Sequence, residues 1–174
     1  GDEPVRGKWA GGIVPRSFTW IIKDRIAISE RPGGCGDVHR RVRRQEEIIW
    51  IRENGFDTVL SLLASDHNLH SYDELGMAWS HVAFGGAGDG VQRLEDVLRR
   101  IDDLTTDGRQ VLVHREELND VLCGLMGAYL LRADLAPTGP RAMSIAEQLT
   151  GRPLGSAGRA IVSLVAPPDE EGPR

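Results

Sequence analysis

The residues of this chain that could bind an anion or transfer a proton gather in one short run. It reads His114, Arg115, Glu116, Glu117, Leu118, Asn119, Asp120, Val121. An arginine can bind an anionic group, and a carboxylate can act as an acid or a base. From Arg115 to Val121 the formal charge is +1 − 3 = −2, which predicts repulsion of a phosphate dianion.

Neither of the two cysteines has the surroundings of a catalytic thiolate. Cys123 stands among Leu122, Leu125 and Met126, which is typical of a small residue in a hydrophobic core. Cys35 lies in a glycine-rich stretch, without a basic partner at a fixed spacing that would lower the pKa of its thiol. Two cysteines without a CxxC pair also predict neither a disulfide framework nor structural zinc.

Two histidines are further candidates for binding. His67 and His70 are three residues apart and close to acidic residues, a spacing that could ligate a transition metal. Polar loop residues produce the same pattern, and we predict no metal and no cofactor. Both histidines remain candidates for contact with a ligand.

An arginine-rich run opens a predicted helix. Its arginines, Arg40, Arg41, Arg43 and Arg44, could meet an acidic protein surface or a phosphorylated small molecule. Alternatively, Arg43 and Arg44 pair with the acidic residues three and four positions further along, Glu46 and Glu47, and leave a solvated face.

The composition indicates a folded protein that does not bind nucleic acid in general. Hydrophobic residues make up 40% and charged residues 27% of 174 residues, and the formal net charge is −5. No apolar run approaches the roughly 18 residues that a membrane span needs, and the first residues do not resemble a signal peptide. We therefore expect a cytoplasmic protein whose partner is a protein or an anionic small ligand.

The hydrophobic pattern predicts strands that alternate with helices, followed by a helical C-terminal third. Short apolar runs predict strands at 18–22, 25–29, 58–63, 79–84 and 111–113. Helical spacing predicts helices at 39–54, 91–104, 120–132, 138–149 and 156–165, with a short helix within 64–76. This order favours an α/β layered domain with a mainly parallel central sheet. We expect one domain over 17–165, an N-terminal extension at 1–16 and a disordered acidic tail at 166–174.

In such a sheet, ligands bind beyond the carboxyl ends of the strands. The site is therefore expected on the loops after Leu63, Phe84 and Val113. This placement puts His67 and His70 on a rim beside Arg115.

The third loop resembles the active-site region of the tyrosine and dual-specificity phosphatases. A buried strand ending in His114 is followed by a six-residue loop and a helix that contains Gly124 and Gly127. The segments 25–32, 55–63 and 79–82 also follow in the family's order, so the resemblance covers about residues 17–165. It implies a three-layer phosphatase-like domain.

The same resemblance implies a degenerate catalytic loop. In the family the strand ends in His-Cys, five residues follow, and an arginine closes the loop. Here Arg115 takes the nucleophile's position, Leu118 that of the usual loop glycine and Val121 that of the arginine. Asp89 lies on the loop where the family carries its general acid, and it is either a remnant of that acid or a cap of the next helix.

These observations predict a pseudophosphatase, that is, a catalytically inactive dual-specificity phosphatase-like protein that acts as a binding or regulatory module. The alternative is an enzyme with a repurposed pocket. In that case Arg115 binds a phosphorylated small molecule or nucleotide, and Glu116, Glu117 or Asp120 acts as acid or base.

Overall fold

A five-stranded sheet forms the centre of the computed structural model, which describes residues 11–34 and 40–165. The strand order is β1-β2-β5-β3-β4. The strands are β1 (Thr19–Ile22), β2 (Ile26–Glu30), β3 (Thr58–Ser61), β4 (Trp79–His81) and β5 (Val111–Arg115). β1 pairs antiparallel with β2, and the other neighbours are parallel. The carboxyl ends of four strands, β2, β3, β4 and β5, therefore lie at the same end of the sheet.

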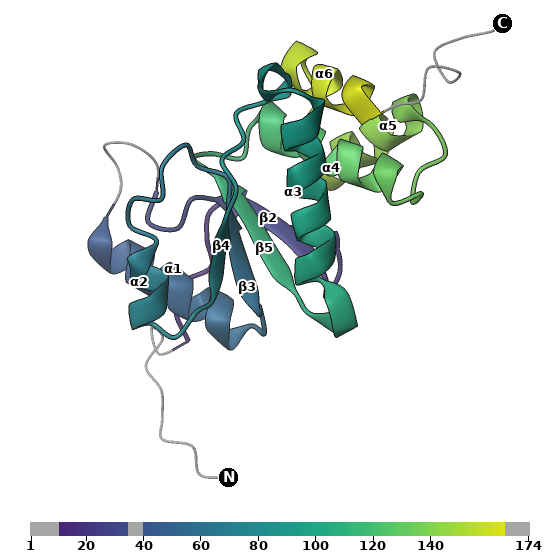
Figure 1. The fold of residues 1–174 in the computed structure, drawn as a ribbon. Helices are drawn as coiled ribbons and strands as arrows, with labels where there is room; N and C mark the ends of the chain where they lie inside the picture. Colours follow the sequence, from purple (N-terminus) through teal and green to yellow (C-terminus); the bar gives the residue numbers. More distant parts are fainter. Residues whose placement is uncertain (1–10, 35–39, 166–174) are drawn as a thin grey trace, which may run out of the picture.

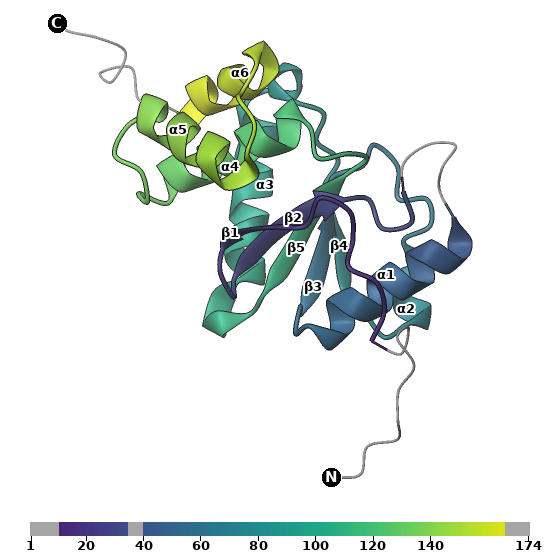
Figure 2. The same ribbon diagram turned by 180° about the vertical axis from the view of Figure 1, so that it is seen from behind.

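Helices cover both faces of the sheet and make three layers (Figure 1). On one face lie α1 (Arg41–Glu53) and α2 (His70–Glu74), which Figure 2 shows from behind. On the other face lie α3 (Val91–Leu104) and the C-terminal helices α4 (Asp120–Arg132), α5 (Gly139–Thr150) and α6 (Ser156–Val165). A short 3₁₀ helix, η2 (Ala87–Asp89), precedes α3.

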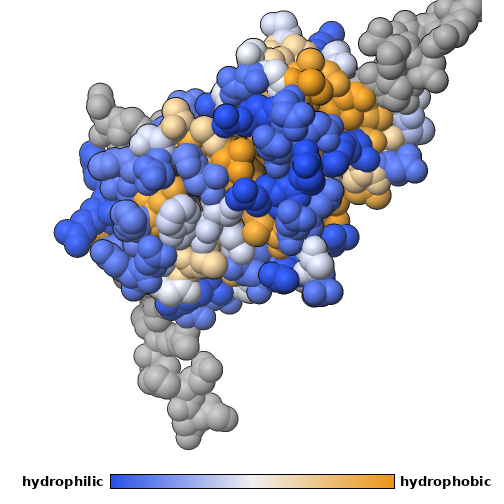
Figure 3. Space-filling view, in the orientation of Figure 1, coloured by the Kyte–Doolittle hydropathy of each residue, from blue (hydrophilic) through white to orange (hydrophobic). Residues whose placement is uncertain are grey.

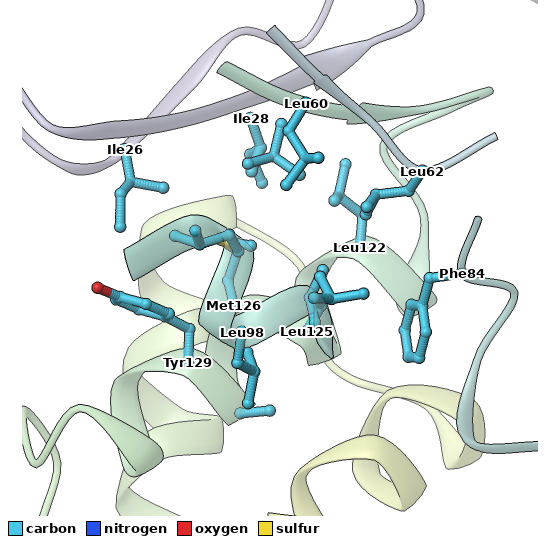
Figure 4. Packing of buried hydrophobic residues seen from close by; sticks show 14 of the residues in the cluster. Ile26, Ile28, Leu60, Leu62, Phe84, Leu98, Leu122, Leu125, Met126 and Tyr129 are labelled. Atoms are coloured by element: carbon cyan, nitrogen blue, oxygen red, sulfur yellow. The ribbon is translucent and has the colours of Figure 1, made fainter. Parts of the chain in front are cut away.

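The alternation of side chains along the strands explains the two cores. Ile26 and Ile28 of β2 pack with α3 and α4, whereas Ala27 between them packs with α1 on the opposite face. In the same way, Val113 of β5 packs in the first core and Leu112 packs in the second. Figure 4 shows the larger core, in which strand residues meet Leu98, Leu122, Leu125, Met126 and Tyr129. The sheet is thus buried on both faces, as continuous apolar strands predict.

The sequence-based prediction of the fold is confirmed in its class and in the order of its elements. The structure has the α/β arrangement with a mainly parallel sheet and a helical C-terminal part. Two strands are shorter than predicted, since β3 ends at Ser61 and β4 at His81. Single ladder bonds continue beyond them, from Leu62 N to His114 O at 3.0 Å and from Phe84 N to Leu62 O at 3.1 Å.

The end of the predicted N-terminal extension packs on the domain. Ile13 N donates to Glu46 O at 3.0 Å, and Arg16 O accepts from Glu30 N at 3.0 Å. Residues 1–10 and the predicted tail at 166–174 lie outside the described residues. Within the described residues, no helix combines the length and the apolar character that crossing a membrane requires.

The close packing of α4 on α6 gives a first prediction. A Cβ atom on Gly124 would lie 2.5 Å from Gly158 Cα and 2.6 Å from Gly158 O, so the two helices would have to separate. We expect Gly124→Ala to lower the free energy of unfolding by about 1–3 kcal/mol, measured by urea denaturation. Gly88→Ala is the control, because nothing lies within 4 Å of its Cβ position. Equal stabilities of the two variants would contradict this account of the α4–α6 contact.

Candidate functional site

A hollow of about 360 Å³ opens at the end of the sheet where the carboxyl ends of β3, β4 and β5 lie. We call it the Arg115 hollow. The residues that line it come from four segments of the chain and are Ala64, Ala83, Phe84, Gly85, Asp89, Arg93 and Arg115. Its position is the one that the strand order of an α/β sheet predicts for a ligand. Arg115 and Asp89, two of the predicted site residues, are brought together here.

Arg115 is the last residue of β5, and its side chain is half-buried. Its Nε atom is buried and, among the described residues, has no hydrogen-bond partner. A buried donor left unpaired costs about 1–3 kcal/mol. An oxyanion is the acceptor that a guanidinium binds best, through paired N–H donors.

Asp89 does not cap α3, so this part of the sequence-based interpretation is wrong. The N-cap residue of α3 is Gly90, at φ 93°, and no side chain caps the helix. Asp89 instead turns back along its own loop, where Oδ2 accepts from Gly85 N at 2.7 Å. The carboxylate is thereby held at the wall of the Arg115 hollow. Whether Asp89 is a remnant acid stays a prediction.

Arg93 is a site residue that the sequence analysis missed. It lies in the first turn of α3, and its Nη1 donates to Ala83 O at 2.9 Å across the hollow. The solvent-facing side of α3 is hydrophilic over its length (Figure 3). One signal was available, since Arg93 follows Asp89 by four residues at the start of a predicted helix.

The acidic residues of the loop after β5 mostly contact other parts of the protein. Glu116 forms an ion pair with Arg31, with 3.0 Å between Oε1 and Nη1. Asp120 accepts with both carboxylate oxygens, from Gly155 N and from Gly158 N, each at 2.8 Å. Asp120 therefore caps the start of α6, and Glu117 is exposed.

The loop's charge of −2 is therefore not the charge that lines the hollow, and the predicted repulsion of a phosphate dianion stays a prediction. The charged residues that line the Arg115 hollow are Arg93, Arg115 and Asp89, which sum to +2 − 1 = +1. The run of carboxylates is acidic in sequence, but its side chains do not line the hollow. A singly charged anion there would meet a complementary charge.

The remaining residues of the loop hold it against the rest of the domain. Asn119 caps α4, because its Oδ1 accepts from Leu122 N at 3.0 Å. Leu118 and Val121 pack against the larger core. Arg152, on the segment between α5 and α6, donates to the carbonyl oxygen of Leu118. The loop is thus tied to α4 and to the segment between α5 and α6.

His114 precedes the loop and is buried, with 1% of its surface exposed. Its Nδ1 lies 3.1 Å from Arg115 O, an acceptor, so Nδ1 carries the proton and Nε2 is left as an acceptor. Burial, with smaller contributions from the nearby Arg31 and His81, lowers the pKa of His114 to about 4. His114 is therefore neutral at physiological pH.

A second, smaller hollow lies beside His114, and His67 is one of the residues that line it. It measures about 10 Å³ and is lined by residues that include Arg31, Arg44, His67, Tyr72 and His114. Such a volume holds roughly one water molecule. His67 thus lines this hollow and not the one at Arg115, so the expected rim beside Arg115 is not formed by His67.

His70 lies apart from both hollows. It is exposed, and its Nδ1 is 3.7 Å from Asp73 Oδ2. Within 11–34 and 40–165, no three histidine, cysteine or acidic side chains are grouped so that they could hold a metal ion. The structure gives His67 and His70 no common ligand position.

The arginine-rich run is partly paired. Arg43 binds Glu47 at 3.2 Å and Glu30 at 3.4 Å, as the helical spacing predicts for Glu47. For Arg44 the predicted pairing is wrong, because among the described residues Glu47 pairs with Arg43 and no ion pair joins Arg44 to Glu46 or Glu47. The Arg44 Nε atom and the Glu46 Oε2 atom are buried there without hydrogen-bond partners. Burial lowers the pKa of Arg44, and the positive charges of Arg31 and Arg41 add to this. Arg40 and Arg41 are exposed.

The two cysteines lie away from the hollow or outside the described residues. Cys123 is fully buried in α4, and burial raises the pKa of its thiol. It is a core residue, as its neighbours in sequence predict. Cys35 lies outside the described residues.

Solved structures of phosphatases share this fold at low sequence identity. Tk-PTP in its active form has a TM-score of 0.67 and 18% identity, over 86% of this chain and 96% of that chain. Kinase associated phosphatase, with its catalytic cysteine replaced by serine, has a TM-score of 0.70 and 14% identity, over 86% of this chain and 93% of that one. Human DUSP28 has a TM-score of 0.62 and 13% identity, over 88% and 95%.

No protein-family model and no curated protein sequence matches the chain. The structural likeness therefore establishes the fold alone, which is that of the tyrosine and dual-specificity phosphatases.

The buried His114 gives a prediction on pH. Its pKa is about 4 in the folded protein and about 6.5 in an unfolded chain, so between these values the unfolded state binds a proton that the folded state does not. The stability that neutral His114 provides is complete above about pH 6.5 and is lost as the pH falls towards 4. We expect a loss of roughly 2 kcal/mol in the free energy of unfolding between pH 7 and pH 5.

Urea denaturation at both pH values, with His114→Asn beside the unchanged protein, isolates this contribution. The variant keeps a donor for Arg115 O but has no group that titrates in this range. The same pH dependence in both proteins would show that His114 is not the cause.

Proposed function

We propose that this chain is a pseudophosphatase, a catalytically inactive protein with the dual-specificity phosphatase fold that binds an anionic group in the Arg115 hollow. The anion belongs to a protein partner or to a small ligand. One observation carries the proposal: directly after His114 stands an arginine whose buried Nε is unpaired within the described structure. In the phosphatases that this region resembles, a catalytic cysteine holds that position.

Loss of turnover follows from the chemistry of the residues. Cysteine-based phosphate transfer needs a thiolate and an arginine that clamps the phosphate. Arg115 stays protonated and cannot act as a nucleophile, and Val121 has no donor to offer. Cys123 is fully buried, and its raised pKa favours the unreactive thiol.

Binding is supported by what remains in the Arg115 hollow. Arg115 and Arg93 line it, and the carboxylates of Glu116 and Asp120 are engaged with Arg31 and α6. The hollow therefore offers a net positive charge at the end of the sheet where ligands bind in this class of fold.

An enzyme with a repurposed pocket is the alternative function. The interactions of Glu116 and Asp120 argue against them as acid or base, which leaves Asp89 as the carboxylate that lines the hollow. Its position beside Arg115 is the observation that favours this alternative. Release of product from phosphorylated metabolites or nucleotides that Asp89→Asn abolishes would establish it over the pseudophosphatase.

We expect no hydrolysis of p-nitrophenyl phosphate above the blank, and weak binding of aryl oxyanions that requires Arg115. Arg115→Ala should weaken phenyl sulfate about tenfold, the equivalent of one charge-assisted hydrogen bond. NMR titration of the backbone amides measures both the affinity and the place of binding.

Arg109→Ala is the matched control for charge, because Arg109 is exposed and precedes β5, at the opposite end of that strand from Arg115. It should leave the affinity unchanged. Equal losses in both variants, or no binding at all, would refute the proposed site. Hydrolysis that tracks the protein and disappears in Cys35→Ser or Cys123→Ser would refute the lack of catalysis.

A further inference from the structure

The charges of the Arg115 hollow come from three separate elements and sum to +1. Arg115 ends β5, Arg93 lies in the first turn of α3, and Asp89 lies in η2. The Asp89 carboxylate is fixed at the wall by its 2.7 Å bond from Gly85 N. Any anion in the hollow therefore meets two guanidinium groups and one fixed negative charge.

The start of α4 carries a negative charge and has two of its backbone donors already paired. At the N-terminus of α4, the side chain of Asn119 already accepts from Leu122 N, and its carbonyl accepts from Cys123 N. Asp120 adds a negative charge to the same helix turn, where it offsets the positive end of the helix dipole. This helix end therefore contributes little to binding a phosphate dianion.

The cost of desolvation decides between anions of different charge. Removing an ion from water costs free energy that rises with the square of its charge, whereas its attraction to a fixed charge of the site rises only in proportion. A site of net charge +1 offsets this cost for a monoanion more readily than for a dianion.

The hollow also has room for an organic group. Ala64, Ala83 and Phe84 line it, and Phe84 is itself buried in the larger core. A volume of about 360 Å³ exceeds that of a single tetrahedral oxyanion and matches the lower end of small-molecule sites. The volume therefore accommodates an anion that carries an organic group.

We propose that the Arg115 hollow selects a singly charged organic oxyanion, such as a carboxylate or a sulfate ester, and that the Asp89 carboxylate discriminates against phosphate dianions. This selectivity rests on the proposed function, in which Arg115 binds an anion. The two properties depend on different residues: Asp89 sets the charge of the preferred anion, and Arg115 provides the affinity.

Phenyl sulfate and phenyl phosphate test the proposal at pH 8. They share the aryl group and the tetrahedral shape, but the phosphate carries a second negative charge above its second pKa of about 6. We expect the unchanged protein to bind phenyl sulfate about tenfold more tightly, which corresponds to about 1.4 kcal/mol. NMR titration gives both dissociation constants.

Asp89→Asn removes the charge and keeps an oxygen that can accept from Gly85 N. The charge of the hollow rises to +2, and we expect phenyl phosphate to bind at least as tightly as phenyl sulfate. Asp103→Asn, on the exposed side of α3, is the control and should leave the preference unchanged. A preference for phenyl phosphate in the unchanged protein, or one that Asp89→Asn does not alter, would overturn the proposal.

Arg93→Gln provides a second route if Asp89→Asn does not fold. It lowers the charge of the hollow to zero and should weaken phenyl phosphate more than phenyl sulfate, while equal weakening would overturn the proposal. If neither ligand binds to the unchanged protein or to Arg115→Ala, the proposed function and this selectivity are both refuted. Tight binding of phenyl phosphate that depends on Arg115 would refute the selectivity alone.

Discussion

The two hydrogen bonds that the Asp120 carboxylate accepts at the start of α6 fix the loop on which the candidate site depends. They join the loop after β5 to Gly155 and Gly158, each at 2.8 Å, over more than thirty residues of sequence. The same contact brings Gly124 of α4 against Gly158, where no Cβ could fit. Asp120 thus anchors α4 to α6, and its charge is used in capping a helix and not in the hollow.

Glu116 is held on the other side of the loop in a similar way. Its side chain pairs with Arg31, and its carbonyl oxygen accepts from Arg31 N at 3.2 Å. With these two carboxylates engaged, the charge that a ligand meets differs in sign from the charge of the sequence segment. The formal charge of a loop therefore says little about its electrostatics until the direction of each side chain is known.

The sequence predicted the parts of the structure that local patterns control. Apolar periodicity and terminators placed α4 and α6 at their observed bounds and gave the sequence of strands and helices along the chain. It failed where a residue far along the chain supplies the partner. The Arg31–Glu116 pair joins positions 85 residues apart, and nothing near Asp120 indicates α6 as its partner. The misjudged cap at Asp89 has another cause: Gly90, at positive φ, takes the cap position, and the carboxylate turns back to Gly85.

The determinants of the hollow are separable from the core of the fold. The two hydrophobic clusters against the sheet lie along β2, β3 and β5, a third lies among α4, α5 and α6, and none of the three charged residues of the hollow belongs to any of them. A change of charge at Asp89, Arg93 or Arg115 therefore alters binding at small cost to the buried packing. His114 differs, since it is buried in the sheet and its neutral state contributes to stability. In the proposed function, a guanidinium at position 115 provides a donor for an anion where the related folds provide a nucleophile. The selectivity for its charge then depends on one carboxylate held by a backbone N–H group.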